Sequence, residues 1–151
     1  ISDHLFFACD VLSSVNIPDS VTRIGESAFA SCDQLRTIDI PDSVTIIDHG
    51  AFRLSGIASV SIPNSVTTIG NGAFSYCDTL TDVTLPGSLT EIGYMTFAHS
   101  LSLTSITIPA SVTFIDNDAF KYHNSLTLTV APDSYAEEYA KAHKIDYTYP
   151  D

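Results

Sequence analysis

The sequence predicts a right-handed solenoid, in which coils with short parallel strands and short helical turns stack into a column closed by a C-terminal helix and strand. Three observations predict this class. A proline recurs every 22 or 23 residues, and a phenylalanine recurs in phase with it, 11 residues after each of the first five prolines. Each unit also mixes alternating apolar and polar residues but is too short to bury its apolar side chains alone, so neighbouring units must cover one another.

Length and composition are consistent with one domain and exclude two classes of partner. The chain has 151 residues, of which 44% are hydrophobic, which is enough for a buried core. Its 18 acidic residues against 6 basic ones give a formal charge of −12. Such a surface repels phosphate backbones, so we expect no nucleic-acid binding. No run of 18 apolar residues occurs, so we expect no membrane insertion.

Each unit divides into three segments, seen clearly in residues 35–56. Residues 35–40 alternate with period two and are rich in β-branched side chains, which predicts a half-buried strand. Pro41 ends that strand because it lacks a backbone donor, and a serine follows two residues after every recurring proline. Residues 44–47 predict a second short extended segment. A Gly or Asp then favours a turn, and Ala51–Phe52 is expected to form a helical turn that buries the ring.

The predicted boundaries follow from this frame. We expect a single domain over residues 1–151, with a partial repeat at 1–11, five repeats of 22–23 residues at 12–125 and a C-terminal cap at 126–151. In the cap, Ser134 and Glu137 form a capping box, and Glu137 with Lys141 forms an i,i+4 pair. Ile145, Tyr147 and Tyr149 then alternate as a strand. Because Ile1 aligns with Ile47 inside a coil, we expect the chain to be part of a longer one.

The repeated frame resembles one known family. Residues 35–41 read Leu-x-x-Ile-x-Ile-Pro, and residues 73–77 read Ala-Phe-x-x-Cys. These features resemble the BspA-like (Treponema pallidum type) leucine-rich repeat proteins over roughly residues 1–125, and the tail resembles that family's usual ending. The resemblance implies a bacterial cell-surface or secreted protein that binds other proteins, often as an adhesin. It also implies that the strands equivalent to residues 35–40 line the concave face.

Three cysteines occupy one position of the frame, three residues after a phenylalanine. A disulfide between Cys9 and Cys32 and a metal site are both open, since adjacent coils bring these positions together. We favour a buried ladder of small, weakly polar side chains, because Ser55 and Ser100 hold the same position in other coils. The expected structural ladders are Phe6, Phe29, Phe52, Phe74, Phe97 and Phe120, with Cys9, Cys32 and Cys77.

No residue pattern points to catalysis, a metal or a cofactor. The five histidines lack zinc-ligand spacing, although His99 and His123 fall in neighbouring coils that stacking is expected to bring together. Residues 116–118, Asp19 and Asp42 lack the glycine and terminal glutamate of a calcium loop. No Gly-x-Ser-x-Gly turn or phosphate-binding glycine loop occurs. We therefore expect no enzyme, no catalytic residue, no metal and no cofactor.

The expected working surface is the outward side of the first strands, which we call the sheet face. Its side chains are small, polar and evenly spaced, and extended solenoid surfaces of this kind commonly bind proteins. The sheet face consists of Ser14, Asn16, Thr37, Asp39, Ser59, Ser61, Asp82, Thr84, Ser105 and Thr107. The expected partner is a protein of the host matrix or host cell surface. The alternative is a structural spacer of a larger surface protein, on which these residues only maintain solubility.

Overall fold

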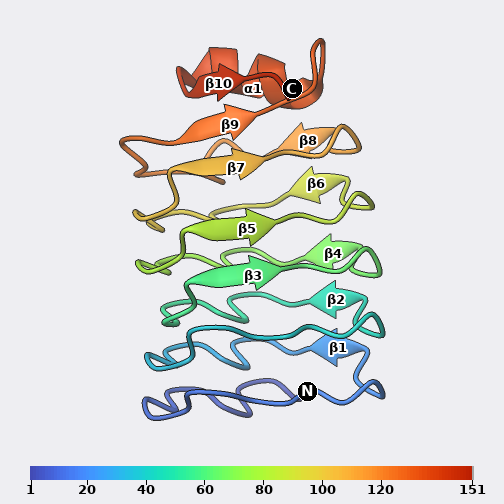
Figure 1. The fold of residues 1–151 in the computed structure, drawn as a ribbon, viewed down its shortest axis with the longest axis vertical. Coiled ribbons are helices and arrows are strands. Elements are labelled where there is room, and N and C mark those ends of the chain that lie inside the picture. Colours follow the sequence, from blue (N-terminus) through green and yellow to red (C-terminus); the bar gives the residue numbers. More distant parts are fainter. Residues whose placement is uncertain (151) are drawn as a thin grey trace.

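The chain winds into a β-solenoid whose coils stack along one axis, with the N-terminus at one end and a helix at the other (Figure 1). The computed structural model describes residues 1–150. All strand pairs are parallel, as expected when equivalent segments of successive coils lie side by side. The predicted solenoid class and its C-terminal helix-and-strand cap are confirmed.

Two walls of short strands flank the core, and the coils that begin at Ile57, Leu80 and Leu103 contribute a strand to each. The first wall is formed by strands that precede the recurring prolines: β3 (Ser59–Ser61), β5 (Asp82–Thr84), β7 (Ser105–Thr107) and β9 (Thr127–Thr129). The second wall is formed by strands that follow them: β1 (Arg23–Ile24), β2 (Ile46–Ile47), β4 (Thr68–Ile69), β6 (Glu91–Ile92) and β8 (Phe114–Ile115). The chain turns at each proline between the two walls.

The first wall is less extensive than the sequence predicts. The coils that begin at Leu12 and Leu35 contain no strand in this wall, and only Thr37 forms a single parallel bridge, with Ser59. The regular ladder begins with β3, directly after the one coil that is a residue shorter than the others. Gly56 lies in that shortened segment, where its backbone N–H donates to the carbonyl of Cys32. A Cβ on Gly56 would lie 2.0 Å from the carbonyl oxygen of Asp33, so the shortened coil requires glycine here.

The serine after each proline bonds to the neighbouring coil in only some repeats. The hydroxyl of Ser43 donates to the carbonyl of Val21 at 2.7 Å, and Ser88 does the same to Val66 at 2.8 Å. The equivalent hydroxyls of Ser65 and Ser111 are buried, yet they have no hydrogen-bond partner among residues 1–150. The serine therefore connects coils at alternate positions instead of bonding within its own turn.

The third segment of each coil consists of successive tight turns. In the coil of Phe52, backbone N–H groups donate three residues back, from Ala51 to Asp48, from Arg53 to Gly50 and from Ser55 to Phe52. Left-handed residues stand two positions before and two after the phenylalanine, at Gly50 (φ 58°) and Leu54 (φ 60°). Because a left-handed residue recurs within each turn, no continuous helix forms, and the expected helical turns take this form instead. Among residues 1–150 the only helix is α1 (Tyr135–His143).

The Gly or Asp that precedes these turns serves packing between coils. Gly25 and Gly70 do not have positive φ, so no left-handed conformation requires glycine there. A Cβ on Gly70 would instead lie 2.5 Å from the backbone nitrogen of His49, and one on Gly25 would lie 2.7 Å from that of Asp3. The backbone of the preceding coil comes too close for a side chain in that direction.

The core is one continuous cluster between the walls, covered at the C-terminal end by α1. The helix buries Ala136, Tyr139 and Ala140 against the last coil, and Ser134 caps it by accepting from the Glu137 N–H. Glu137 is 4% exposed; its carboxylate accepts from the Asp133 N–H at 2.7 Å and from Lys141 at 2.6 Å. The ion pair and the Ser134 half of the predicted capping box are thus present, whereas the Glu137 carboxylate bonds to the N–H of Asp133 instead of that of Ser134. Strand β10 (Asp146–Thr148) pairs with β9 and covers the edge of the first wall.

Candidate binding surfaces

A groove of about 650 Å³ lies on the sheet face, over the first wall. Six of the ten expected sheet-face residues line it: Thr37, Asp39, Ser59, Ser61, Asp82 and Thr84. All are exposed except Ser59, which is half-buried. Strand pairing places Ser59 beside Asp82 and Ser61 beside Thr84, so these polar side chains form short rows across the coils. Ser14, Asn16, Ser105 and Thr107 are exposed outside the groove.

The groove carries negative charge. Its lining includes the carboxylates of Asp39, Asp42 and Asp82 and the amide of Asn64, and none of its lining residues is basic. Its floor is formed by apolar core residues such as Ile38, Val60 and Ile62. The arrangement of acidic rim and partly apolar floor is complementary to a cationic, partly apolar segment.

The six phenylalanines form one continuous stack through the interior. Neighbouring ring centroids, from Phe6 to Phe120, lie 5.1–5.6 Å apart and the rings are within 11° of parallel. Phe29, Phe52, Phe74 and Phe97 are fully buried. The stacked rings therefore form a continuous aromatic part of the core from one coil to the next.

The cysteine position connects a coil to the one before it at Cys32, Cys77, Ser100 and His123, whereas the Ser55 hydroxyl contacts Cys77 of the following coil. The thiol Sγ atoms of Cys32 and Cys77 each lie 3.1 Å from a phenylalanine carbonyl of the preceding coil, Phe6 and Phe52 respectively. Ser100 makes the same contact with Phe74 at 2.7 Å, and His123 Nε2 with Phe97 at 2.8 Å. All three cysteines are free, and burial raises the pKa of Cys77 to about 11. Burial also raises the pKa of Cys32.

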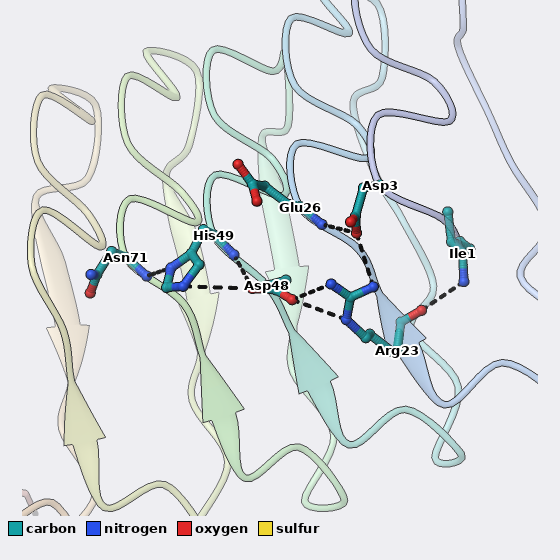
Figure 2. Close-up of polar contacts among 7 residues, drawn as sticks. All are labelled: Ile1, Asp3, Arg23, Glu26, Asp48, His49 and Asn71. Carbon is teal, nitrogen blue, oxygen red and sulfur yellow. Dashed lines mark hydrogen bonds and ion pairs between the residues drawn. The ribbon is translucent and has the colours of Figure 1, made fainter.

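A polar ladder joins the first four coils along the edge after the second wall (Figure 2). Arg23 contacts the carboxylates of Asp3 at 2.9 Å and Asp48 at 2.5 Å, while Asp48 accepts from the His49 N–H at 2.8 Å. His49 Nδ1 in turn accepts from the Asn71 N–H at 3.0 Å. Partial burial alone would raise the pKa of Asp48, but the His49 N–H and Arg23 together hold that pKa below its ordinary value. The ladder therefore connects four successive coils through side chains as well as through backbone hydrogen bonds.

The histidines and acidic turns do not converge on a metal site. Among residues 1–150, no three His, Cys, Asp or Glu side chains lie close enough together to hold a metal ion. His99 stacks on Tyr76 at the surface, whereas His123 is directed at a backbone carbonyl. Asp116 accepts from the Asp118 N–H at 2.9 Å, so this acidic turn is internally bonded.

Within residues 1–150, no helix is long and apolar enough to cross a membrane.

A second surface was not anticipated from the sequence. Leu54, Tyr76, His99 and Tyr122 each stand two residues after a stacked phenylalanine and project from the turns. The ring centroids of Tyr76 and His99 lie 4.2 Å apart, and those of His99 and Tyr122 lie 4.0 Å apart. The signal was present in the sequence, since large residues recur at one frame position that faces away from the core.

Parallel strands, an internal phenylalanine stack and near-identical coils define a leucine-rich repeat solenoid. The family model for the BspA type leucine-rich repeat region matches residues 1–127 in six copies, and the chain belongs to this family. The resemblance inferred from the sequence is therefore confirmed. No curated protein matches the chain significantly.

Three solved structures illustrate the relationship. A leucine-rich repeat protein from Bacteroides ovatus is 32% identical, with a TM-score of 0.76 over 83% of this chain and 36% of that one. One from Bacteroides capillosus is 39% identical, with a TM-score of 0.59 over 63% of this chain and 76% of that one. The Treponema pallidum leucine-rich repeat protein is 25% identical, with a TM-score of 0.73 over 98% of this chain and 78% of that one. The chain thus spans little more than a third of the Bacteroides ovatus protein.

Proposed function

We propose that this chain is a non-catalytic protein-binding module of a bacterial cell-surface or secreted protein, acting as an adhesin through its sheet face. The observation that carries the proposal is the groove on that face, which combines three carboxylates, rows of small polar side chains and an apolar floor. Its chemistry favours a cationic segment of a host matrix or cell-surface protein. Attraction between such a segment and a chain of charge −12 would also accelerate encounter.

The experiment measures binding of the intact chain to immobilised fibronectin, laminin and collagen at low and physiological salt. The test variant carries Asp39→Asn and Asp82→Asn, which remove two groove charges with little change in size. The matched control carries Glu91→Gln and Glu138→Gln, which remove two exposed charges elsewhere. We expect the groove variant to bind about tenfold more weakly, and added salt to reduce wild-type binding.

Two results would contradict this function. Equal losses in the groove variant and its control would mean that only total charge matters. Absence of binding to every probe at low salt would favour the alternative of a structural spacer in a larger surface protein.

A further inference from the structure

The turn side of the solenoid carries large side chains at a backbone position that does not favour them. Leu54, Tyr76, His99 and Tyr122, together with Arg53 and Lys121, are termed the turn ridge. The first four have left-handed backbone, with φ of 60°, 58°, 60° and 71°. Left-handed backbone is less favourable for an L-residue than for glycine, because the Cβ atom comes too close to the following carbonyl oxygen. Earlier coils hold Ala8 and Ser31 at this position, so the fold itself does not require a large side chain there.

Core packing does not account for these side chains either. Leu54 is 44% exposed and Tyr122 is 53% exposed, while Tyr76 and His99 are half-buried between their neighbours. Stacking covers both faces of the His99 ring and one face each of Tyr76 and Tyr122, which leaves the ring edges and the phenol hydroxyls available. Tyr is enriched at protein interfaces because it combines an apolar ring with a polar hydroxyl, so this surface suits a protein partner.

Positive charge flanks the stack. Arg53 lies over the ring of Tyr76, with Cζ 5.4 Å from the centroid, and Lys121 Nζ lies 5.4 Å from the centroid of Tyr122. These are two of only six basic residues in the chain. Arg53 forms no ion pair with any of residues 1–150, and Lys121 is paired only with Asp118 of its own turn. Tyr and Arg are also the residue types that dominate protein-binding hot spots, and the sheet face has neither.

We infer that the turn ridge is a second protein-binding surface, and that its partner is an acidic segment with apolar anchors. Carboxylates of the partner would pair with Arg53 and Lys121, and its apolar side chains would cover Leu54 and the ring edges. This partner has the opposite charge to the one proposed for the groove, so the two surfaces would bind different segments and can be tested separately.

The test selects a displayed random-peptide library on the intact chain and measures the affinity of selected peptides. Two exposed positions are changed, by Arg53→Glu and Tyr122→Ala, with Arg53→Lys and Tyr122→Phe as conservative partners. Thermal unfolding of each variant verifies folding, and the groove variant Asp39→Asn with Asp82→Asn is the control. We expect peptides that combine Asp or Glu with Leu, Phe or Tyr, and at least about tenfold weaker binding to R53E and Y122A. R53K, Y122F and the groove variant should retain most of the binding.

Three results would overturn the inference: failure to enrich any such peptide, enrichment only of basic peptides that depend on the groove carboxylates, or undiminished binding to both R53E and Y122A. Binding of neutral polysaccharides that is lost in Y122A would likewise overturn the assignment to a protein partner. If the groove variant binds the matrix proteins as tightly as the wild type does, only the proposed sheet-face function is contradicted. The inference about the turn ridge is unaffected, because its peptides do not require the groove.

Discussion

The Sγ atom of Cys77 lies 3.1 Å from the carbonyl oxygen of Phe52, one coil below. The same carbonyl also accepts the backbone N–H of Ser55, so it has two partners. Cysteine, serine and histidine are interchangeable at this position because each can donate to that oxygen and fit beside the phenylalanine column. Cys32 and Cys77 therefore serve as structural donors between coils.

Ser100 tests this donor role most directly. Its hydroxyl donates to Phe74 and also accepts the backbone N–H of Cys77 at 3.2 Å. Ser100→Ala leaves that buried N–H without its partner, so we expect a loss of about 1–3 kcal/mol in the free energy of unfolding measured with urea. Ser100→Cys introduces the side chain that Cys77 carries at the equivalent position, so it should lower the free energy of unfolding by less than Ser100→Ala does. Equal losses in the two variants would contradict a donor role.

Cys9 and Cys77 should differ in their reactivity towards a thiol reagent. Burial raises the pKa of Cys77 to about 11, so almost none of it is thiolate at neutral pH, and the side chain is also inaccessible. Cys9 is partly exposed. We expect a thiol reagent at pH 8 to label Cys9 in the folded protein and Cys77 only after unfolding, with Cys9→Ser as the control. Labelling of Cys77 at the rate of Cys9 would show that the middle coil, which contains Cys77, opens readily.

Two serines at equivalent positions should respond differently to the same change. Ser43→Ala removes a hydrogen bond to Val21 and should cost about 0.5–1.5 kcal/mol in unfolding free energy. Ser65→Ala removes a buried hydroxyl that has no partner among residues 1–150, so the change should be close to neutral or stabilising. Urea unfolding of both variants makes the comparison, and a larger loss at Ser65 would contradict it.

Alanine substitution should lower the melting temperature much more at Gly56 than at Gly87. A Cβ on Gly56 would meet backbone at 2.0 Å, so Gly56→Ala must displace one coil from another and should lower the melting temperature sharply. A Cβ on Gly87 would meet only the Asn64 side-chain oxygen, at 3.7 Å. Gly87→Ala should therefore leave the melting temperature within a few degrees of wild type, and similar melting temperatures for the two variants would refute the assigned role of Gly56.

Acid should weaken the C-terminal cap through Glu137. Hydrogen bonds from Lys141, from the Tyr149 hydroxyl and from the Asp133 N–H lower the pKa of Glu137 from 4.5 to about 2. A lowered pKa contributes stability above pH 4.5, and that contribution disappears as the pH falls from 4.5 towards 2. We expect the melting temperatures of wild type and Glu137→Gln to differ most near pH 7 and to converge by pH 2. A difference independent of pH would assign the effect to packing.

The sequence pattern predicts most of the fold because the period itself carries the information. The phenylalanine frame, the two extended segments, the cap of Ser134 and the pair of Glu137 with Lys141 each depend on residue type and spacing alone. The missing strands before Ser59 could not be predicted, because backbone pairing depends on the register at each junction between coils. The close approach at Gly70 is likewise a contact between coils that no single repeat reveals.

Of the two candidate binding surfaces, the sequence predicts the sheet face but not the turn ridge. The alternation of polar residues predicts the exposed side of the first wall, including Asp39 and Asp82. The stack of Tyr76, His99 and Tyr122 was missed because their left-handed backbone has no glycine to signal it, and period-two or helical patterns do not describe such turns. Searching each frame position for recurrent large residues would have found it.

The turns between Phe6 and Phe120 have one further consequence. The backbone N–H groups of the stacked phenylalanines donate in one direction along the column: Phe29 N–H donates to the carbonyl of Ala51 in the following coil, and Phe52 N–H donates to that of Ala73 in the next. This side of the molecule therefore has a built-in polarity, with amide hydrogens directed towards the helical end and carbonyl oxygens away from it. Any additional coil could join only in the same orientation, because an inverted one would set donor against donor.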